Sequence, residues 1–349
     1  MPSTGETTWT VVGPDLLPVE AVESFVSYMD ARRLSPNTVK TYCHGLALYV
    51  RVLDTADLSW ERVRLSDIAD FVIWLRRPAP NVIPLTAEVS RRQPRTVNKI
   101  LAAVSAFYGY QVRNGCDVAD SLVVWRHVAN RGYRPFLQHV SKSKPVRTSV
   151  LRLKEDHRLP KTLTPDQVQL LLDATTHLRD RFLLALLYET GMRIGQALGL
   201  RHEDVRTWQG EIAIVPRSDN ANSARAKTHR EHIVHVSTEL GRLYSDYMHV
   251  EYGDLDSDYV FVNLWGGERG HPLTYPAVMG LVRRLRTKTG VAFHPHMLRH
   301  THATEFLRAT GRIDITAKRL THQSSQTTEA YYDHLDDNDL RLEVERFWA

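Results

Sequence analysis

The stretch FHPHMLRHTHATEF, residues 293–306, places four histidines and one arginine within fourteen positions. Residues three and four apart are neighbours on a helix, so His296 would share a face with both Arg299 and His300. A pair of histidines at this spacing indicates a metal site, whereas a histidine beside an arginine indicates a site for a phosphate. The rest of the chain decides between these two interpretations.

Length and composition predict a folded chain of two domains. The chain has 349 residues, more than one core usually holds, and 42% of them are hydrophobic. We find no apolar run long enough to span a membrane and no secretory signal at the start. Two cysteines are too few for a disulfide framework or a cysteine zinc site. We therefore expect a cytoplasmic protein with no membrane partner.

Helical periodicity predicts a mainly α fold with a small β-sheet. Residues 1–15 are interpreted as a flexible leader, and residues 16–128 contain four amphipathic segments that predict a four-helix domain. Residues 129–160 lack strong periodicity and carry three prolines, which indicates an interdomain linker. Residues 161–349 form the second predicted domain, in which EIAIVP (211–216) and HIVHVS (232–237) alternate like strands.

Positive charge is concentrated in one part of the chain. The formal net charge is +5, but residues 131–161 hold nine Lys or Arg and two acids, a local net charge of +7. Such a basic stretch is typical of a protein that binds a nucleic-acid backbone, and Lys142, Lys144 and Arg147 are candidate contacts. A solvated linker is the alternative interpretation.

Four short motifs follow one another: ETGMRIGQALGLRHEDV (189–205), a hairpin around Lys227, HPHMLRHTHAT (294–304) and LTHQSSQTTEAYYDH (320–334). In order, spacing and context they resemble the motifs of the tyrosine recombinase (phage integrase) family. The resemblance implies a core-binding domain, a basic linker and a catalytic domain. It also implies a site-specific DNA recombinase, the integrase or transposase of a mobile element, that needs no metal, ATP or other cofactor.

Two arginines match the family's catalytic arginines, Arg193 in the first motif and Arg299 in the histidine-rich motif. Breaking a phosphodiester without a metal requires positive donors at the non-bridging oxygens, where charge accumulates in the transition state. Arginine suits this task because it stays charged and its planar fork can hold two oxygens. A surface salt bridge is the alternative role for Arg193.

The resemblance assigns Tyr331 as the nucleophile that forms a 3′-phosphotyrosyl bond, since it lies nine residues after His322. Tyr332 stands beside it and remains an alternative. A phenol has a pKa of about 10, so it needs a nearby base and cations to attack at neutral pH. His296 is the expected proton acceptor.

Lys227 lies between the two predicted strands and matches the family's catalytic lysine. It would protonate the leaving 5′ oxygen, and His322 would hydrogen-bond the scissile phosphate. Arg225 and Arg230 flank Lys227, and the three could instead be simple DNA-backbone clamps.

Two positions depart from the family pattern. Gln196 stands where the family usually has an acidic residue three positions after the first arginine, and Thr321 stands where a glycine often precedes the histidine. A neutral amide can still hydrogen-bond, so we expect catalysis to survive.

Three alternatives remain open. The first is a metallohydrolase, because His296 and His300 have metal spacing. Against it, HMLRH lacks the glutamate of the HExxH pattern, and no cysteine lies near. His300 is then expected as a supporting or core histidine, and His302 as an exposed helix residue. A DNA-binding protein of the same fold without catalysis and a type IB topoisomerase-like relaxing enzyme are the other two.

The resemblance also implies partners. We expect double-stranded DNA, a homotetramer on DNA that forms from a monomer in solution, accessory recombination proteins, and association with the nucleoid. A short helix over Asn338–Trp348, with one apolar side, is expected to dock into a neighbouring protomer; packing of Phe347 and Trp348 on their own domain is the alternative.

Overall fold

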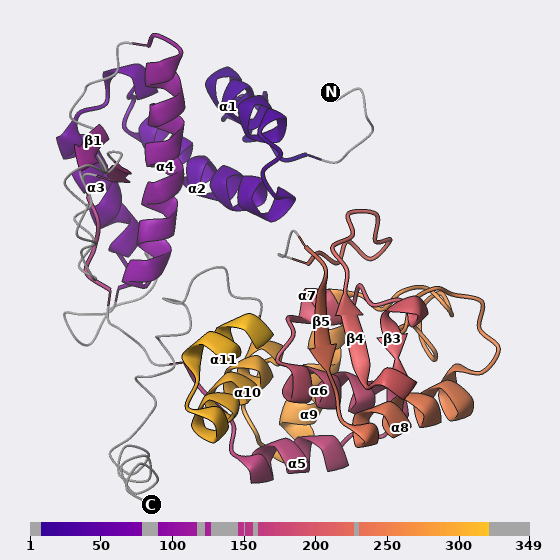
Figure 1. Cartoon of the computed structure of the whole chain (residues 1–349). Coiled ribbons are helices and arrows are strands. Elements are labelled where there is room, and N and C mark those ends of the chain that lie inside the picture. The colour runs from indigo at the N-terminus through magenta and orange to yellow at the C-terminus, as the bar shows by residue number, and fades with distance from the viewer. Residues whose placement is uncertain are drawn as a thin grey trace, which may run out of the picture. The chain divides into compact units, whose positions relative to one another are not determined.

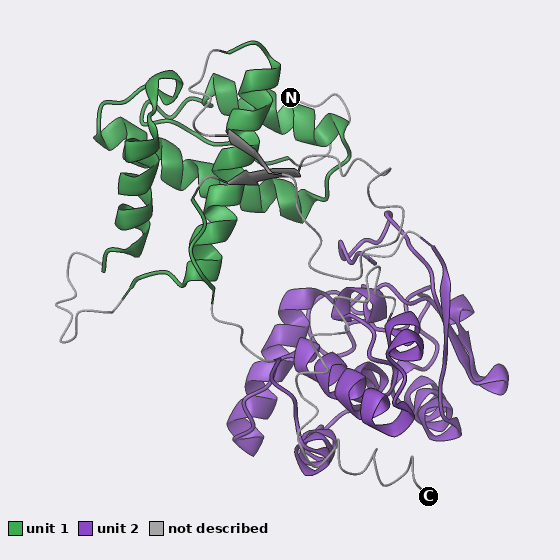
Figure 2. Cartoon of the chain, turned by 60° about the vertical axis from the view of Figure 1, so that its left-hand side comes forward, with its two compact units in different colours: residues 1–157 green, residues 158–349 purple. Residues whose placement is uncertain are grey.

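The structure, a computed structural model, describes residues 8–78, 90–116, 123–126, 146–149, 151–155, 160–226 and 230–320. The chain divides into two compact units, residues 1–157 and 158–349 (Figure 2). The division falls within the predicted linker.

Unit 1 is built around four helices: α1 (Glu20–Ala31), α2 (Pro36–Thr55), α3 (Leu65–Arg76) and α4 (Pro94–Arg113) (Figure 1). All four fall where the periodicity predicts them. Ser35 caps α2, because its side-chain oxygen accepts a hydrogen bond from the Thr38 backbone N–H at 3.2 Å. The apolar helix faces meet in one core that includes Phe25, Tyr49, Phe71 and Phe107.

The segment before α1 differs from its prediction as a flexible leader. Val11 is 2% exposed and belongs to the core of unit 1. The ammonium group of Lys40 lies 4.5 Å from the centre of the Trp9 ring, and the Thr8 hydroxyl donates to Asp30 at 3.0 Å. The prediction is therefore wrong for residues 8–15, where one buried valine is too short a signal to read as periodicity. Residues 1–7 lie outside the described residues.

Part of the predicted linker belongs to unit 1. Strand β1 (Val123–Arg126) pairs antiparallel with β2 (Val146–Ser149), with Val123 opposite Ser149. Asn98 on α4 then holds Leu153 from both sides, donating to its carbonyl at 2.9 Å and accepting from its N–H at 2.8 Å. Strand β2 has four residues and lies in a basic stretch without clear periodicity, so no sequence pattern predicts it.

Unit 2 contains seven α-helices in its described part, three short helices of other types, and a three-stranded antiparallel sheet of order β3-β4-β5. The helices are α5 (Pro165–Asp173), α6 (Leu178–Thr190), α7 (Ile194–Ala197), α8 (Thr238–Tyr247), α9 (Tyr275–Thr289), α10 (Pro295–Thr310) and α11 (Ile313–Arg319). The strands are β3 (Val205–Arg206), β4 (Glu211–Ile214) and β5 (His232–His235). The mainly α fold with a small sheet is confirmed, as are the two strands expected on either side of Lys227.

Helix α6 is the central element of unit 2. It contacts α5, α7, α8 and α10, and its side chains Phe182, Leu183, Leu186 and Leu187 are fully buried. No residue of α6 is exposed, and even its charged residues Arg179 and Asp180 are buried, so the helix is surrounded by protein. Figure 1 shows the sheet at one side of this unit and the α10–α11 pair at the other.

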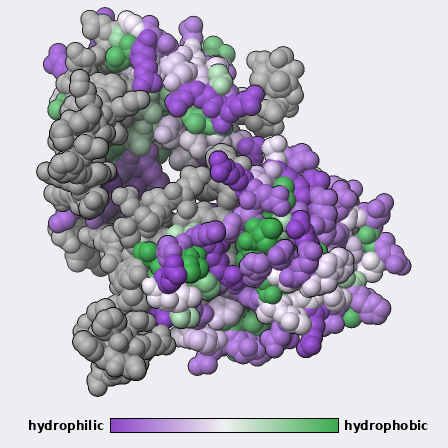
Figure 3. All heavy atoms as spheres, in the orientation of Figure 1, coloured by the Kyte–Doolittle hydropathy of each residue, from purple (hydrophilic) through white to green (hydrophobic). Residues whose placement is uncertain are grey.

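The visible surface is mostly hydrophilic. In Figure 3 the apolar residues of the described parts form small separate groups. Among the described residues, no helix combines the length and the apolar character needed to cross a membrane.

Candidate active site

Arg299 joins three of the four sequence motifs. It lies on α10 and is 1% exposed. Its Nη1 donates to the carbonyl of Gly191 and its Nη2 to the carbonyl of Leu320, each at 2.6 Å. Gly191 precedes Arg193 by two residues, and Leu320 precedes His322 by two. The Arg299 guanidinium therefore binds the backbone two residues before Arg193 and the backbone two residues before His322.

Arg193 begins α7 immediately after α6 ends. Gly191 terminates α6 in the left-handed conformation, with φ 63°, and the chain enters α7 two residues later. Arg193 is the half-buried N-cap residue of α7, with an extended backbone. The carbonyl that Arg299 holds is thus part of the turn that orients Arg193.

Gln196 takes the place of the usual acidic residue and supports this turn. Its Oε1 accepts a hydrogen bond from the backbone N–H of Arg193 at 2.7 Å. The side chain is buried, at 3% exposure, and its Nε2 has no hydrogen-bond partner within the described structure. A carboxylate could make the same bond to Arg193 without burying an unpaired donor.

His296 is exposed near the start of α10, one turn before His300. The two imidazole rings meet edge to face, with centroids 4.5 Å apart. Over the described ranges of the chain, no three His, Cys, Asp or Glu side chains are grouped as ligands for a metal ion. The pair therefore lacks a third protein ligand in that part of the structure.

His302 is buried, at 8% exposure, so its expected exposure is wrong. Its ring lies against Gly191, where an added Cβ would come within 2.6 Å of the imidazole Cδ2. Its Nε2 accepts a hydrogen bond from Arg319 Nε at 3.0 Å. Burial, with the Arg319 charge as a second cause, lowers the pKa of His302 to about 3. His302 is therefore neutral.

Arg319 is a site-supporting residue that no motif indicated. Besides His302, its guanidinium donates to the carbonyls of Glu189 at 3.0 Å and His235 at 3.2 Å. These bonds attach α11 to the end of α6 and to β5. No sequence pattern distinguishes Arg319 from the other basic residues of the last helical turns.

The segment leading to Lys227 lies against α7. A Cβ added to Gly195 would come within 2.8 Å of the carbonyl oxygen of Arg225, so the two backbones are in direct contact. Arg225 and Arg230 are exposed on either side of residues 227–229. The structure thus brings together α7, α10 and the chain two residues before Lys227.

Several predicted residues lie outside the described structure: Lys227, His322, Tyr331, Tyr332, Lys142 and Lys144. The backbone of Arg147 is described as part of β2, but its side chain is not.

Comparison with known proteins identifies the family. Residues 161–339 match the model of the phage integrase family, and residues 22–115 match the phage integrase N-terminal SAM-like domain. The chain belongs to the phage integrase family. Transposase A from transposon Tn554 of Staphylococcus aureus is 40% identical to this integrase-family protein over 331 residues, 94% of this chain and 91% of the transposase. Tyrosine recombinase XerD of Mycobacterium leprae is 26% identical over 321 residues, 89% of this chain and 91% of XerD.

Two solved structures share the fold of this integrase-family protein. The Tn1549 transposon integrase in complex with transposon right end DNA has a TM-score of 0.64 at 18% identity, covering 95% of this chain and 100% of that one. The XerH recombinase bound to palindromic difH substrate has a TM-score of 0.63 at 17% identity, covering 96% and 86%. As a tyrosine recombinase, the protein binds DNA and cuts and rejoins its strands.

Proposed function

We propose that this tyrosine recombinase moves a mobile element, as its transposase or integrase, and that Tyr331 is its nucleophile. The support for a mobile element is the Tn554 transposase, which is 40% identical over nearly the whole of both chains. The XerD relative is much less similar, at 26%.

The reaction exchanges one phosphodiester for another. The Tyr331 oxygen attacks the scissile phosphorus and gives its proton to His296. The bond from phosphorus to O5′ breaks, and the leaving O5′ takes a proton from Lys227. The 3′-phosphotyrosyl bond retains the energy of the cut bond, so a 5′ hydroxyl can reverse the attack and rejoin the strand without a cofactor.

Positive donors stabilise the transition state. Arg193 and Arg299 hold the non-bridging oxygens, and His322 donates a further hydrogen bond. The observation that carries this assignment is the pair of hydrogen bonds from Arg299 to Gly191 and Leu320, which brings three motifs to one place. Since Arg299 is 1% exposed, it meets a phosphate only in a DNA-bound arrangement of the surrounding chain.

Assembly on DNA follows from the chemistry. One active site cuts one strand, so exchange between two duplexes needs four protomers. In this proposal residues 16–128 are the core-binding domain, residues 161–349 are the catalytic domain, and the basic stretch between them contacts the DNA backbone with steep salt dependence.

A covalent adduct tests the proposal. Nicked duplexes made from the DNA that flanks the gene should yield a protein–DNA adduct that resists SDS, whereas random duplexes should not. Adduct formation should be equal with and without EDTA. Binding without any adduct would favour a DNA-binding protein, and EDTA inhibition that zinc reverses would favour a metal-dependent site.

A further inference from the structure

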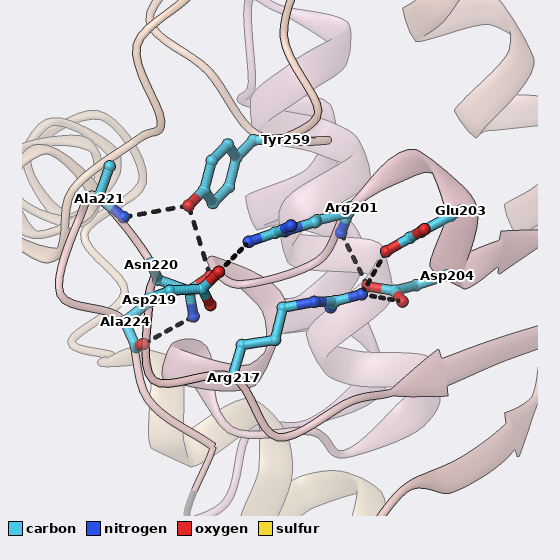
Figure 4. Close-up of polar contacts among 9 residues, drawn as sticks. All are labelled: Arg201, Glu203, Asp204, Arg217, Asp219, Asn220, Ala221, Ala224 and Tyr259. Carbon is cyan, nitrogen blue, oxygen red and sulfur yellow. Dashed lines mark hydrogen bonds and ion pairs between the residues drawn. The ribbon is translucent and has the colours of Figure 1, made fainter.

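The chain that leads from β4 to Lys227 is fixed by a polar network (Figure 4). It begins at Arg217, whose two terminal nitrogens donate to both carboxylate oxygens of Asp204 at 2.7 and 2.8 Å. Asp204 is 2% exposed, and Arg217 also donates to Glu203 at 2.7 Å. A buried bidentate pair of this kind has a defined geometry, so the start of the segment is held in place.

The next residues are held by side chains on both sides. Arg201 donates to Asp219 at 3.1 Å, and the Tyr259 hydroxyl accepts from the backbone N–H of Ala221 at 3.0 Å (Figure 4). Asn220 Nδ2 then donates to the carbonyl of Ala224 at 2.8 Å, which closes a turn over the five residues 220–224.

Asn222 attaches this turn to the body of unit 2. Its Nδ2 donates to the carbonyls of Leu198 and Leu273, both at 2.9 Å, and its Oδ1 accepts from the N–H of Ala224 at 3.0 Å. Both amide protons are therefore used outside the turn. Leu198 directly follows α7, so Asn222 links the turn to the helix that Arg193 begins.

Two glycines of the first motif allow this close approach. An added Cβ at Gly195 would meet the Arg225 carbonyl at 2.8 Å, and one at Gly199 would meet Asn220 Nδ2 at 3.0 Å. At Gly195 the backbone of α7 touches the backbone of the turn, and at Gly199, just after α7, the Asn220 side chain lies against the backbone. The backbone of Arg225 is thereby placed, and two residues span at most about 7 Å from there to Lys227.

We propose that Asn222 is a positioning residue for Lys227. Together with Gly195, Asn222 fixes the backbone of Arg225 against α7. In this proposal α7 is the common support from which Arg193 and Lys227 approach the same phosphate. The proposal rests on the proposed function, in which the Lys227 ammonium protonates the leaving O5′. A general acid acts over a hydrogen-bond distance of about 2.6–3.2 Å, so loss of this anchor weakens protonation specifically.

A change of leaving group isolates that step. When sulfur replaces the bridging 5′ oxygen, the bond from phosphorus to sulfur breaks and the electron pair leaves on a stable thiolate that needs no proton. Single-turnover cleavage of oxygen and sulfur substrates would be compared for Asn222→Ala and Lys227→Ala. Asn263→Ala is the matched control, because that amide makes a longer 3.5 Å contact within its own loop.

We expect Asn222→Ala to slow cleavage of the oxygen substrate at least 10-fold, and by no more than the roughly 10²–10⁴-fold that complete loss of a general acid costs. Cleavage of the sulfur substrate should stay within about three-fold of the parent enzyme, and Lys227→Ala should show the same rescue. Equal slowing of Asn222→Ala on both substrates, with Lys227→Ala rescued, overturns the inference alone. Absence of rescue for Lys227→Ala overturns the acid assignment and the inference with it.

A second variant covers the case in which Asn222→Ala does not fold. Gly195→Ala leaves every polar bond of the turn in place but forces Arg225 away from α7, whereas Gly241→Ala has its nearest neighbour at 4.0 Å. Gly195→Ala should slow the oxygen substrate and be rescued by sulfur, and Gly241→Ala should match the parent on both. Parent rates for Gly195→Ala on the oxygen substrate would contradict the inference.

Discussion

Arg299 and Gly191 are joined by a 2.6 Å hydrogen bond from Nη1 to the backbone carbonyl. Gly191 is also the residue at which α6 ends with a positive φ and against which the His302 ring packs. The turn into α7 is therefore held by a charged donor on one side and a neutral imidazole on the other.

The two arginines that we propose to be catalytic should differ in their effect on stability. Arg299→Ala leaves two carbonyls unpaired, which should lower the free energy of unfolding by about 2–4 kcal/mol, while half-buried Arg193→Ala should cost less. Both should slow cleavage by about 10²–10³-fold or more, because each removes a transition-state donor. Urea unfolding and single-turnover cleavage would measure the two effects. Normal cleavage by either variant would exclude that arginine from the chemistry.

Gln196 should matter through its oxygen. Gln196→Glu keeps an acceptor for the Arg193 N–H, a hydrogen bond worth about 1 kcal/mol. This variant should therefore cleave DNA at a rate within about ten-fold of the parent. Gln196→Leu has a similar volume but no acceptor, so α7 should loosen and cleavage should slow further. Cleavage rates across pH 6–9 would compare them. If the leucine variant is the faster of the two, the Arg193 bond is not what Gln196 contributes.

His302 should make stability depend on pH. Its folded-state pKa is depressed to about 3, so below about pH 6.5 the unfolded chain binds a proton that the folded chain does not. Its contribution is present above pH 6.5 and is lost as pH falls towards 3, by about 1.4 kcal/mol per pH unit. Urea unfolding of His302→Gln between pH 7.5 and 5 should show a shallower slope than the parent. The exposed His249→Gln is the control, and equal slopes for parent and His302→Gln would refute the assignment.

Sequence patterns predicted what local chemistry encodes. The periodicity of the four helices of unit 1 and the alternation of β4 and β5 are local signals, and the structure confirms both. The burial of His302 depends instead on residues distant in sequence: Arg319, which is 17 residues away, and Gly191, which caps the end of α6. Helix α7 has four residues, too few to show periodicity, and its position comes from contacts with α6 and with Arg225 that no pattern records.

The end of the chain should couple protomers. Deletion of residues 338–349, a segment outside the described structure, should leave binding to a single site unchanged but weaken synapsis and recombination. Gel-shift titration and recombination of two-site plasmids would separate these steps. Normal recombination by the truncated protein would exclude a coupling role, and unfolding would show that the segment packs on its own domain.

The nucleophile is the central claim, and peptide mapping of the trapped adduct tests it most directly. A nicked substrate would be allowed to react, the DNA digested to a nucleotide remnant, and the modified tyrosine located by mass spectrometry in the parent, Tyr331→Phe and Tyr332→Phe proteins. We expect the remnant on Tyr331 in the parent and in Tyr332→Phe, and no adduct in Tyr331→Phe despite DNA affinity within a few-fold of the parent. A remnant on Tyr332, or an adduct that survives in Tyr331→Phe, would contradict the account.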